Sequence, residues 1–256
     1  MSEAMRMWVE IIFNLGYLIA IWTIVILMAR RQHVVAPENR AVAQRLMWAF
    51  ALLALGDTGH VGFRVLAYSL GGLEAQPVVL GVPLSLVGLG ALATAITVTF
   101  FYMLMVDVWR LRFNKPLGLA GWFLLATGVF RLLIMLFPQN DWSQVVPAQP
   151  WGLIRNLPLM IQGLGVMVLI LRDAYRVHDR AFQWIGWMIA ASYAFYTPVI
   201  LFVQQAPLLG MLMIPKTLAY VAIAVIAYRA LYAQPEGVAV AAAAADGSCQ
   251  LRARML

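Results

Sequence analysis

Residues 46–70 read LMWAFALLALGDTGHVGFRVLAYSL, an apolar run that is interrupted by Asp57, His60 and Arg64. A run of about 20 apolar residues is long enough to cross a bilayer as a helix. Positions i, i+3 and i+7 fall on one helix face, so the three side chains lie together. Each ionisable group costs at least about 2.5–3.5 kcal/mol at the bilayer centre. The stretch therefore predicts a transmembrane helix with a buried polar site, whose side chains need partners, water or a ligand.

The composition of the whole chain is also typical of a membrane protein, because it is rich in hydrophobic residues and poor in charged ones. Of its 256 residues, 63% are hydrophobic and 11% are charged, whereas soluble domains contain about 25% charged residues. Cys249 is the single cysteine, and of the three histidines only His60 lies in an apolar segment. The sequence therefore excludes a disulfide framework, a cysteine-based metal site and a bis-histidine haem in the membrane. We expect neither a metal nor a cofactor.

Seven apolar segments are long enough to span a bilayer. They are Met7–Met28, Leu46–Leu70, Val79–Val106, Leu117–Phe137, Trp151–Leu171, Ala181–Val203 and Leu208–Tyr228. The first is too long and too aromatic for the apolar part of a signal peptide, so we expect it to be retained. The sequence thus predicts an all-α, polytopic integral membrane protein, with a seven-transmembrane-helix bundle over residues 1–232. Residues 233–256, rich in alanine, glycine and polar residues, predict a disordered cytoplasmic tail.

Basic residues alternate from one predicted loop to the next. They follow the first, third, fifth and seventh segments, and the loops after the second, fourth and sixth contain no lysine or arginine. The positive-inside rule then places the N-terminus outside and the C-terminus in the cytoplasm. This distribution also explains the net charge of +7 without a nucleic-acid partner. We expect a multi-pass protein of the cell membrane, in contact with membrane lipids.

The third segment is rich in small residues, including Gly88, Gly90, Ala91, Ala93 and Ala95. Small side chains let transmembrane helices approach one another closely. We therefore expect this helix to run through the middle of the bundle.

With that orientation, five helices place ionisable side chains in the outer half of the bundle, and the inner half has almost none. We expect these helices to surround a polar cavity that is open to the outside. Its predicted lining is Asp57, His60, Arg64, Arg131, Arg155 and Lys216. Glu10, Asn14, Gln162, Tyr196 and Tyr220 continue the same polar helix faces and are expected around it.

Cations outnumber carboxylates in this predicted cavity. Arg64, Arg131, Arg155 and Lys216 contribute +4, and Glu10 and Asp57 contribute −2. A buried surplus of positive charge is costly unless an anion completes it. The sequence therefore predicts that the protein binds, senses or transports an anionic small molecule or lipid head group, such as a phosphate, carboxylate or sulfate. The nearly apolar inner half favours capture or sensing over conduction.

A second function fits the same architecture. Seven helices, an external N-terminus and a lysine in Pro215-Lys216-Thr217 of the seventh segment resemble the rhodopsins. The resemblance implies retinal bound to Lys216 as a Schiff base. Microbial rhodopsins carry an aspartate one turn before that lysine, where this chain has Leu212. Asp57 or Glu10 would then have to serve as the counterion.

A third function is an intramembrane enzyme that modifies a lipid. His60 would act as a base oriented by Asp57, while Arg64 and Lys216 would hold a phosphate or a developing negative charge. The purely structural alternative is a static network in which Asp57 pairs with Arg64 or Lys216 and locks the bundle.

Overall fold

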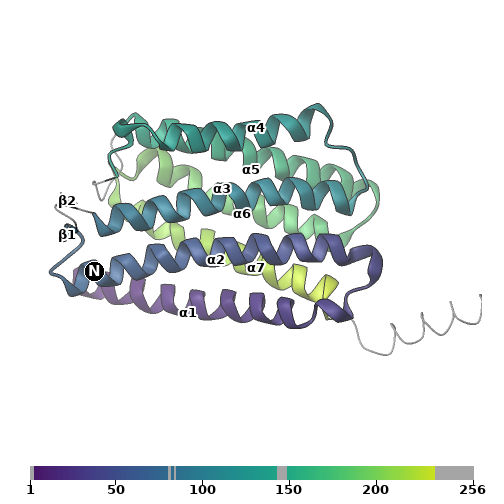
Figure 1. The fold of residues 1–256 in the computed structure, drawn as a ribbon, viewed down its shortest axis with the longest axis horizontal. Coiled ribbons are helices and arrows are strands. Elements are labelled where there is room, and N and C mark those ends of the chain that lie inside the picture. Colours follow the sequence, from purple (N-terminus) through teal and green to yellow (C-terminus); the bar gives the residue numbers. More distant parts are fainter. Residues whose placement is uncertain (1–2, 80–81, 84, 143–148, 234–256) are drawn as a thin grey trace, which may run out of the picture.

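Seven α-helices run side by side along one long axis (Figure 1). The computed structural model describes residues 3–79, 82–83, 85–142 and 149–233. The helices are α1 (Glu3–Arg30), α2 (Arg40–Ser69), α3 (Leu86–Arg112), α4 (Gly118–Met135), α5 (Trp151–Arg176), α6 (Arg180–Phe202) and α7 (Met213–Leu231). The 3-10 turns are η1 (Gln32–Val34), η2 (Pro37–Asn39), η3 (Pro138–Asn140) and η4 (Pro207–Leu212). Apart from Ala233, the predicted tail over 233–256 lies outside the described residues.

All seven helices are long and apolar enough to cross a membrane, which confirms the predicted helical architecture. Even α4, with 18 residues, measures about 27 Å at 1.5 Å per residue, close to the thickness of a hydrocarbon core. Large apolar side chains point outward along the helices; Leu119 is 90% exposed and Ile19 is 69% exposed. Soluble monomers rarely expose contiguous apolar surface of this kind. The outer surface of the bundle therefore fits a lipid environment.

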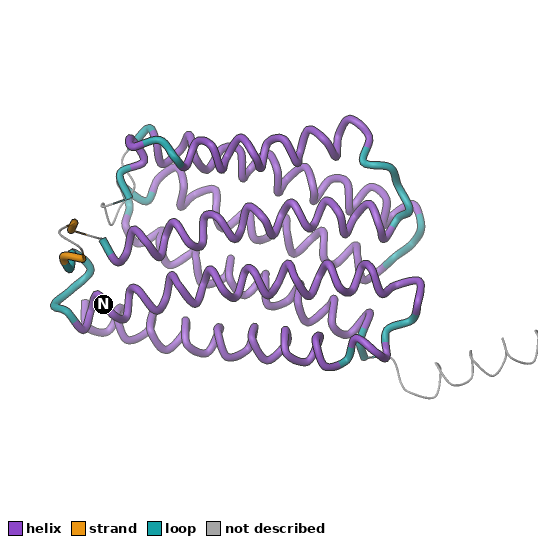
Figure 2. The backbone as a smooth tube through the Cα atoms, viewed as in Figure 1, coloured by secondary structure: helices purple, strands orange, loops and turns teal. Residues whose placement is uncertain are grey.

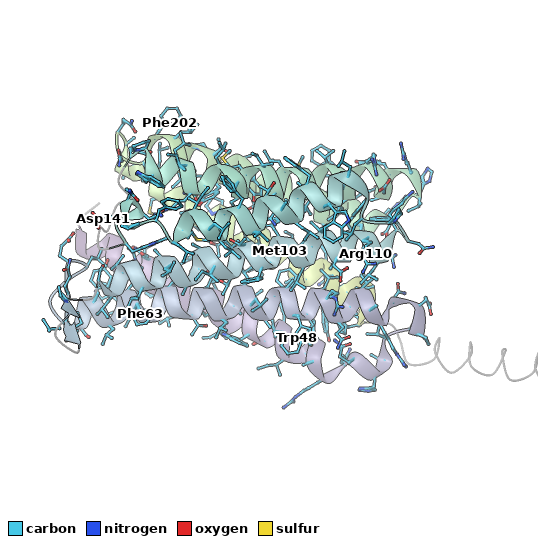
Figure 3. The ribbon with its side chains drawn as sticks, turned by 45° about the horizontal axis from the view of Figure 1, so that its top comes forward. Trp48, Phe63, Met103, Arg110, Asp141 and Phe202 are labelled. Carbon is cyan, nitrogen blue, oxygen red and sulfur yellow. The ribbon has the colours of Figure 1, made fainter. Side chains whose placement is uncertain are left out.

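The connecting loops gather at the two ends of the bundle (Figure 2). We call one end the basic end; it holds the α1–α2, α3–α4 and α5–α6 loops and the end of α7. The opposite end, the hairpin end, holds the start of α1 and an antiparallel hairpin of β1 (Val78–Val79) and β2 (Val82–Pro83). Figure 3 labels Arg110 at the basic end and Asp141 at the hairpin end.

Two helices begin later than the apolar segments predict. α3 begins at Leu86, because Ser85 caps it by accepting a backbone N–H at 3.1 Å, and Val79 lies in β1 instead. α7 begins at Met213, after the 3-10 turn η4. Apolar residues suit an extended or 3-10 lead-in as well as an α-helix, so the length of the run did not mark these two boundaries.

Small residues bring α2 and α3 into close contact. A Cβ atom at Gly56 would collide with the Thr97 side chain. One at Gly90 would lie 2.9 Å from the His60 Cα atom. Missing side chains let two helix backbones approach, as small residues do in membrane bundles. Because α3 also contacts α4 and α5, it occupies the middle of the bundle as predicted.

Ion pairs join the helices at the basic end. Asp107 of α3 binds Arg45 of α2 at 2.7 Å and Arg110 at 2.6 Å. Arg112, at the end of α3, binds Asp179 at 2.8 Å, just before α6. These contacts tie α2 and α6 to the central helix.

Two buried side chains fix α5 and α7 at the same end. Asp173 of α5 is 1% exposed and accepts hydrogen bonds from Trp109 at 2.9 Å and from Arg172. The Tyr232 hydroxyl donates to the Ala43 carbonyl at 2.7 Å. Burial raises the pKa of the Tyr232 phenol well above its ordinary value, so this donor stays protonated. The helices are therefore cross-linked to one another at the basic end.

We expect Gly90→Ala to lower the free energy of unfolding by about 1–3 kcal/mol, the usual range for overpacking. The added methyl would press on the α2 backbone, which has no side-chain freedom to yield. The midpoint of thermal unfolding in detergent measures this effect. Gly62→Ala is the matched control, because nothing lies within 4 Å of its Cβ position. Equal losses in the two variants would contradict the close α2–α3 contact.

Candidate functional site

The Arg64 charge is neutralised by a carboxylate on the neighbouring helix. Its Nη2 lies 2.8 Å from the Glu10 Oε1 of α1, near the hairpin end, and the two side chains are 20% and 32% exposed. Asn14 is half-buried one turn further along α1. Since the two charges cancel, the structure removes Arg64 and Glu10 from the predicted surplus of positive charge.

Asp57 lies near the middle of α2 and is held by a tyrosine. The Tyr17 hydroxyl of α1 donates to its Oδ2 at 2.6 Å. Thr94 of α3 and Lys216 of α7 are its other polar neighbours. Among the described residues, no cation lies within 4.0 Å of this carboxylate. The predicted static pair of Asp57 with Arg64 or Lys216 is therefore not formed here.

Lys216 projects from α7 into the interior of the bundle. Its Nζ lies 4.6 Å from the centre of the Tyr196 ring and 5.6 Å from that of Tyr220. Asp57 and Arg131 lie within its electrostatic reach. Although Lys216 lies deep among protein atoms, it is only half-buried.

Arg131 is the most deeply buried cation of the predicted site, at 2% exposure. Its Nε donates to the Arg155 carbonyl of α5 at 2.9 Å, and its Nη1 donates to the Ala95 carbonyl of α3 at 2.8 Å. Nη1 also donates to the Thr99 hydroxyl. All three acceptors are neutral, and within the described part of the chain Arg131 forms no ion pair with a carboxylate.

Tyr196 connects the three cations of the interior. Its hydroxyl donates to Asn156 Oδ1 at 3.1 Å, and both Arg131 and Arg155 act on it electrostatically. Arg155 is 8% exposed, and its guanidinium lies 4.2 Å from the centre of a Trp142 ring. We define Arg131, Arg155 and Lys216 around Tyr196 as the cationic cluster.

His60 and Gln162 lie beside this cluster with incomplete hydrogen bonding. The His60 Nδ1 and Gln162 Oε1 atoms are buried without a hydrogen-bond partner among the described residues. Gln162 donates only a long bond, 3.3 Å, to the Leu124 carbonyl. No hydrogen bond joins His60 to Asp57 in the described part of the chain, so the acid–base pair of the enzyme hypothesis is not assembled.

The cationic cluster keeps a surplus of positive charge. Arg131, Arg155 and Lys216 contribute three charges, and Asp57 opposes one of them. Asp141 follows Asn140, whose carbonyl accepts from Arg155 at 3.3 Å, and even with the Asp141 charge counted one positive charge remains. Buried charge that lacks a compensating partner is strongly destabilising. The cluster is therefore suited to an added anion.

An aromatic layer separates the cluster from the basic end. Rings of Phe50, Phe101, Tyr102 and Tyr220 contact one another with centroids 5.1–5.5 Å apart. The Tyr102 and Tyr220 hydroxyls share a hydrogen bond of 2.8 Å, and all four side chains are at most 5% exposed. In the part of the chain that the structure describes, these packed rings lie between the cluster and the basic end.

Four residues of the site escaped prediction as site residues. Tyr17, which binds Asp57, was visible only as the continuation of a polar face on the first helix. Tyr102 and Tyr193, whose hydroxyl donates to the Leu159 carbonyl at 2.8 Å, resemble ordinary core tyrosines. Thr99 receives the Arg131 guanidinium, but a threonine in an apolar helix carries no signal of that role.

Two surface hollows lie away from this cluster. A hollow of about 580 Å³ at the basic end is lined in part by Arg112, His178 and Arg180. A smaller apolar one of about 400 Å³ runs along the outer face of α4. Neither includes a predicted site residue. No group of three or more potential metal-ligating side chains occurs in the described ranges.

Comparisons with family models, with curated proteins and with solved structures gave no match.

Proposed function

We propose that this protein recognises an anionic small molecule or lipid head group in the membrane, at the cationic cluster. The observation that carries the proposal is that, among the described residues, neither Arg131 nor Lys216 forms an ion pair with a carboxylate. Arg131, at 2% exposure, donates to carbonyl and hydroxyl oxygens, and Lys216 rests against tyrosine rings. Charge-assisted hydrogen bonds to an anion are about twice as strong as neutral ones. An anion would therefore supply what both side chains lack.

The accessible surface supports an approach from the hairpin end. Lys216, Tyr196 and Asp57 are half-buried, as are the neighbouring residues Met213–Thr217 at the start of α7. The aromatic layer blocks the opposite direction. Binding or sensing is favoured over transport, because a ligand that arrives at the cluster finds no polar continuation beyond it.

The proposed orientation puts the hairpin end outside the cell and the basic end in the cytoplasm. It rests on the positive-inside rule, since the loop arginines and Lys115 lie at the basic end. The cluster then faces the outer half of the cell membrane. An anion from the outside medium and an anionic lipid of the outer leaflet are both within reach of such a site.

Labelling of Cys249, the single cysteine, tests the orientation. We expect a membrane-impermeant maleimide to label Cys249 only after cells are permeabilised, because the C-terminus is proposed to be cytoplasmic. The matched control combines Cys249→Ser with Gln76→Cys, an exposed position beside the hairpin. This variant should react in intact cells. The reverse pattern would overturn the orientation.

Thermal unfolding in detergent tests anion recognition, with inorganic phosphate, sulfate and phosphatidic acid as probes. At 100 times its Kd, a ligand adds about 2.7 kcal/mol to the free energy of unfolding. We expect at least one probe to raise the unfolding midpoint of the native protein. Phosphatidylcholine should not, because its head group carries no net charge.

Lys216→Gln should remove the stabilisation by the anionic probe, because it removes one charge of the cluster. Lys115→Gln should retain it, since Lys115 is exposed at the basic end. The ligand-free midpoint of each variant shows whether it folds. If none of the three probes stabilises the native protein, or if Lys216→Gln responds like it, the proposal fails. Stabilisation by phosphatidic acid but not by phosphate would identify a lipid ligand. Stabilisation by phosphate alone would identify a small anion.

The surroundings of Lys216 favour retinal as a second candidate ligand. Its amine is flanked by two tyrosine rings, and Asp57 lies within electrostatic reach as a counterion but not in an ion pair. An aldehyde would condense with the neutral amine, forming a C=N bond and releasing water. The proposed anion and this aldehyde would use the same side chain in different chemical ways.

Addition of all-trans-retinal to the purified protein distinguishes the two ligands. A Schiff base on Lys216 is expected to give a red-shifted visible band that is absent in Lys216→Ala and kept in Lys115→Ala. Borohydride reduction would fix the adduct, which mass spectrometry locates on a peptide containing Lys216. The absence of a band, or the same band in Lys216→Ala, would exclude the retinal alternative.

A further inference from the structure

Asp57 is a built-in competitor for any anion at Lys216. It is a carboxylate that acts on the Lys216 amine electrostatically. Opposite charges attract more strongly in an apolar interior than they do in water. A direct Asp57–Lys216 pair would consume the Lys216 charge and leave less of it for a ligand.

Tyr17 holds the carboxylate in a different direction. Its hydroxyl donates to Asp57 Oδ2 at 2.6 Å, the short length of a bond to a charged acceptor. Tyr17 is 7% exposed and packs with Ile21 on the inward face of α1. A second hydrogen bond, from Trp22 to the Thr58 hydroxyl at 2.9 Å, fixes the register of α1 on α2. The tyrosine is therefore rigidly placed.

We propose that Tyr17 is a positioning residue that sets the anion affinity of the site by keeping Asp57 away from Lys216. This inference rests on the proposed function. The hydrogen bond from Tyr17 satisfies the Asp57 carboxylate without neutralising it and holds it toward α1, so Lys216 stays open to the ligand. Without that bond, the carboxylate turns to Lys216, the cation that acts on it electrostatically.

The chain offers a rescue that separates positioning from packing. Tyr17→Phe keeps the ring and removes the hydroxyl, so the dissociation constant for inorganic phosphate should rise at least about tenfold, equivalent to one decade of affinity. Asp57→Asn in the same protein removes the competing charge and should restore the affinity. Tyr228→Phe, which deletes a hydroxyl at the basic end, should bind phosphate like the native protein. Unchanged affinity in Tyr17→Phe, or no recovery in the double variant, would overturn the proposal.

A second measurement needs no ligand. The coupling between Asp57→Asn and Lys216→Gln, measured by thermal unfolding as a double-mutant cycle, reports the strength of their direct interaction. We expect a clearly larger coupling in the Tyr17→Phe background than in the native background. Equal couplings would contradict the role of Tyr17. If the native protein binds none of the anionic probes, the proposed function fails, and this cycle still decides whether Tyr17 keeps the two charges apart.

Discussion

The structure depends on how Arg131 is accommodated in an apolar bundle. A buried polar group is tolerated when its hydrogen bonds are made, and this guanidinium finds its acceptors on α3 and α5. One side chain of α4 thereby fixes three helices at one level. Because the acceptors are neutral, the hydrogen bonds are satisfied while the charge is not. That uncompensated charge acts on Tyr196 and Lys216, and it gives the site its chemical character.

The close contact of α2 and α3 puts Asp57 of α2 at the same level of the bundle as the Arg131 guanidinium. Thr94 donates to the Gly56 carbonyl at 3.1 Å, a bond that is possible because α2 carries no side chain there. One residue further along α3, the Ala95 carbonyl accepts from Arg131. A single turn of α3 thus contacts α2 beside Asp57 and also accepts a hydrogen bond from Arg131. Bulkier residues at this crossing would separate the two sides.

Composition and periodicity were sufficient to predict seven helices that are long and apolar enough to span a membrane. Counting residues from the helix ends placed Arg131, Asp57 and Lys216 at related depths, and the structure brings Asp57 and Arg131 within electrostatic reach of Lys216. Depth does not determine how each helix is rotated about its own axis. For that reason the sequence did not reveal that Arg64 pairs with Glu10, which halves the number of carboxylates available to the cluster.

The start of α3 illustrates a different limit. Hydrophobicity measures the cost of exposing a residue and is blind to backbone conformation, so Val79 in a β-hairpin and Leu86 in a helix contribute alike to an apolar run. The decisive signal was the short polar Ser85, which caps the helix. The same reasoning applies to Thr99, where a small hydroxyl within an apolar run has a specific partner. In a membrane helix, each hydroxyl must find an acceptor within the protein, and identifying that acceptor requires the arrangement of neighbouring helices. Which polar side chains meet in this bundle therefore depends on how each helix is rotated about its axis. The packing of small residues between α2 and α3 determines that rotation for these two helices.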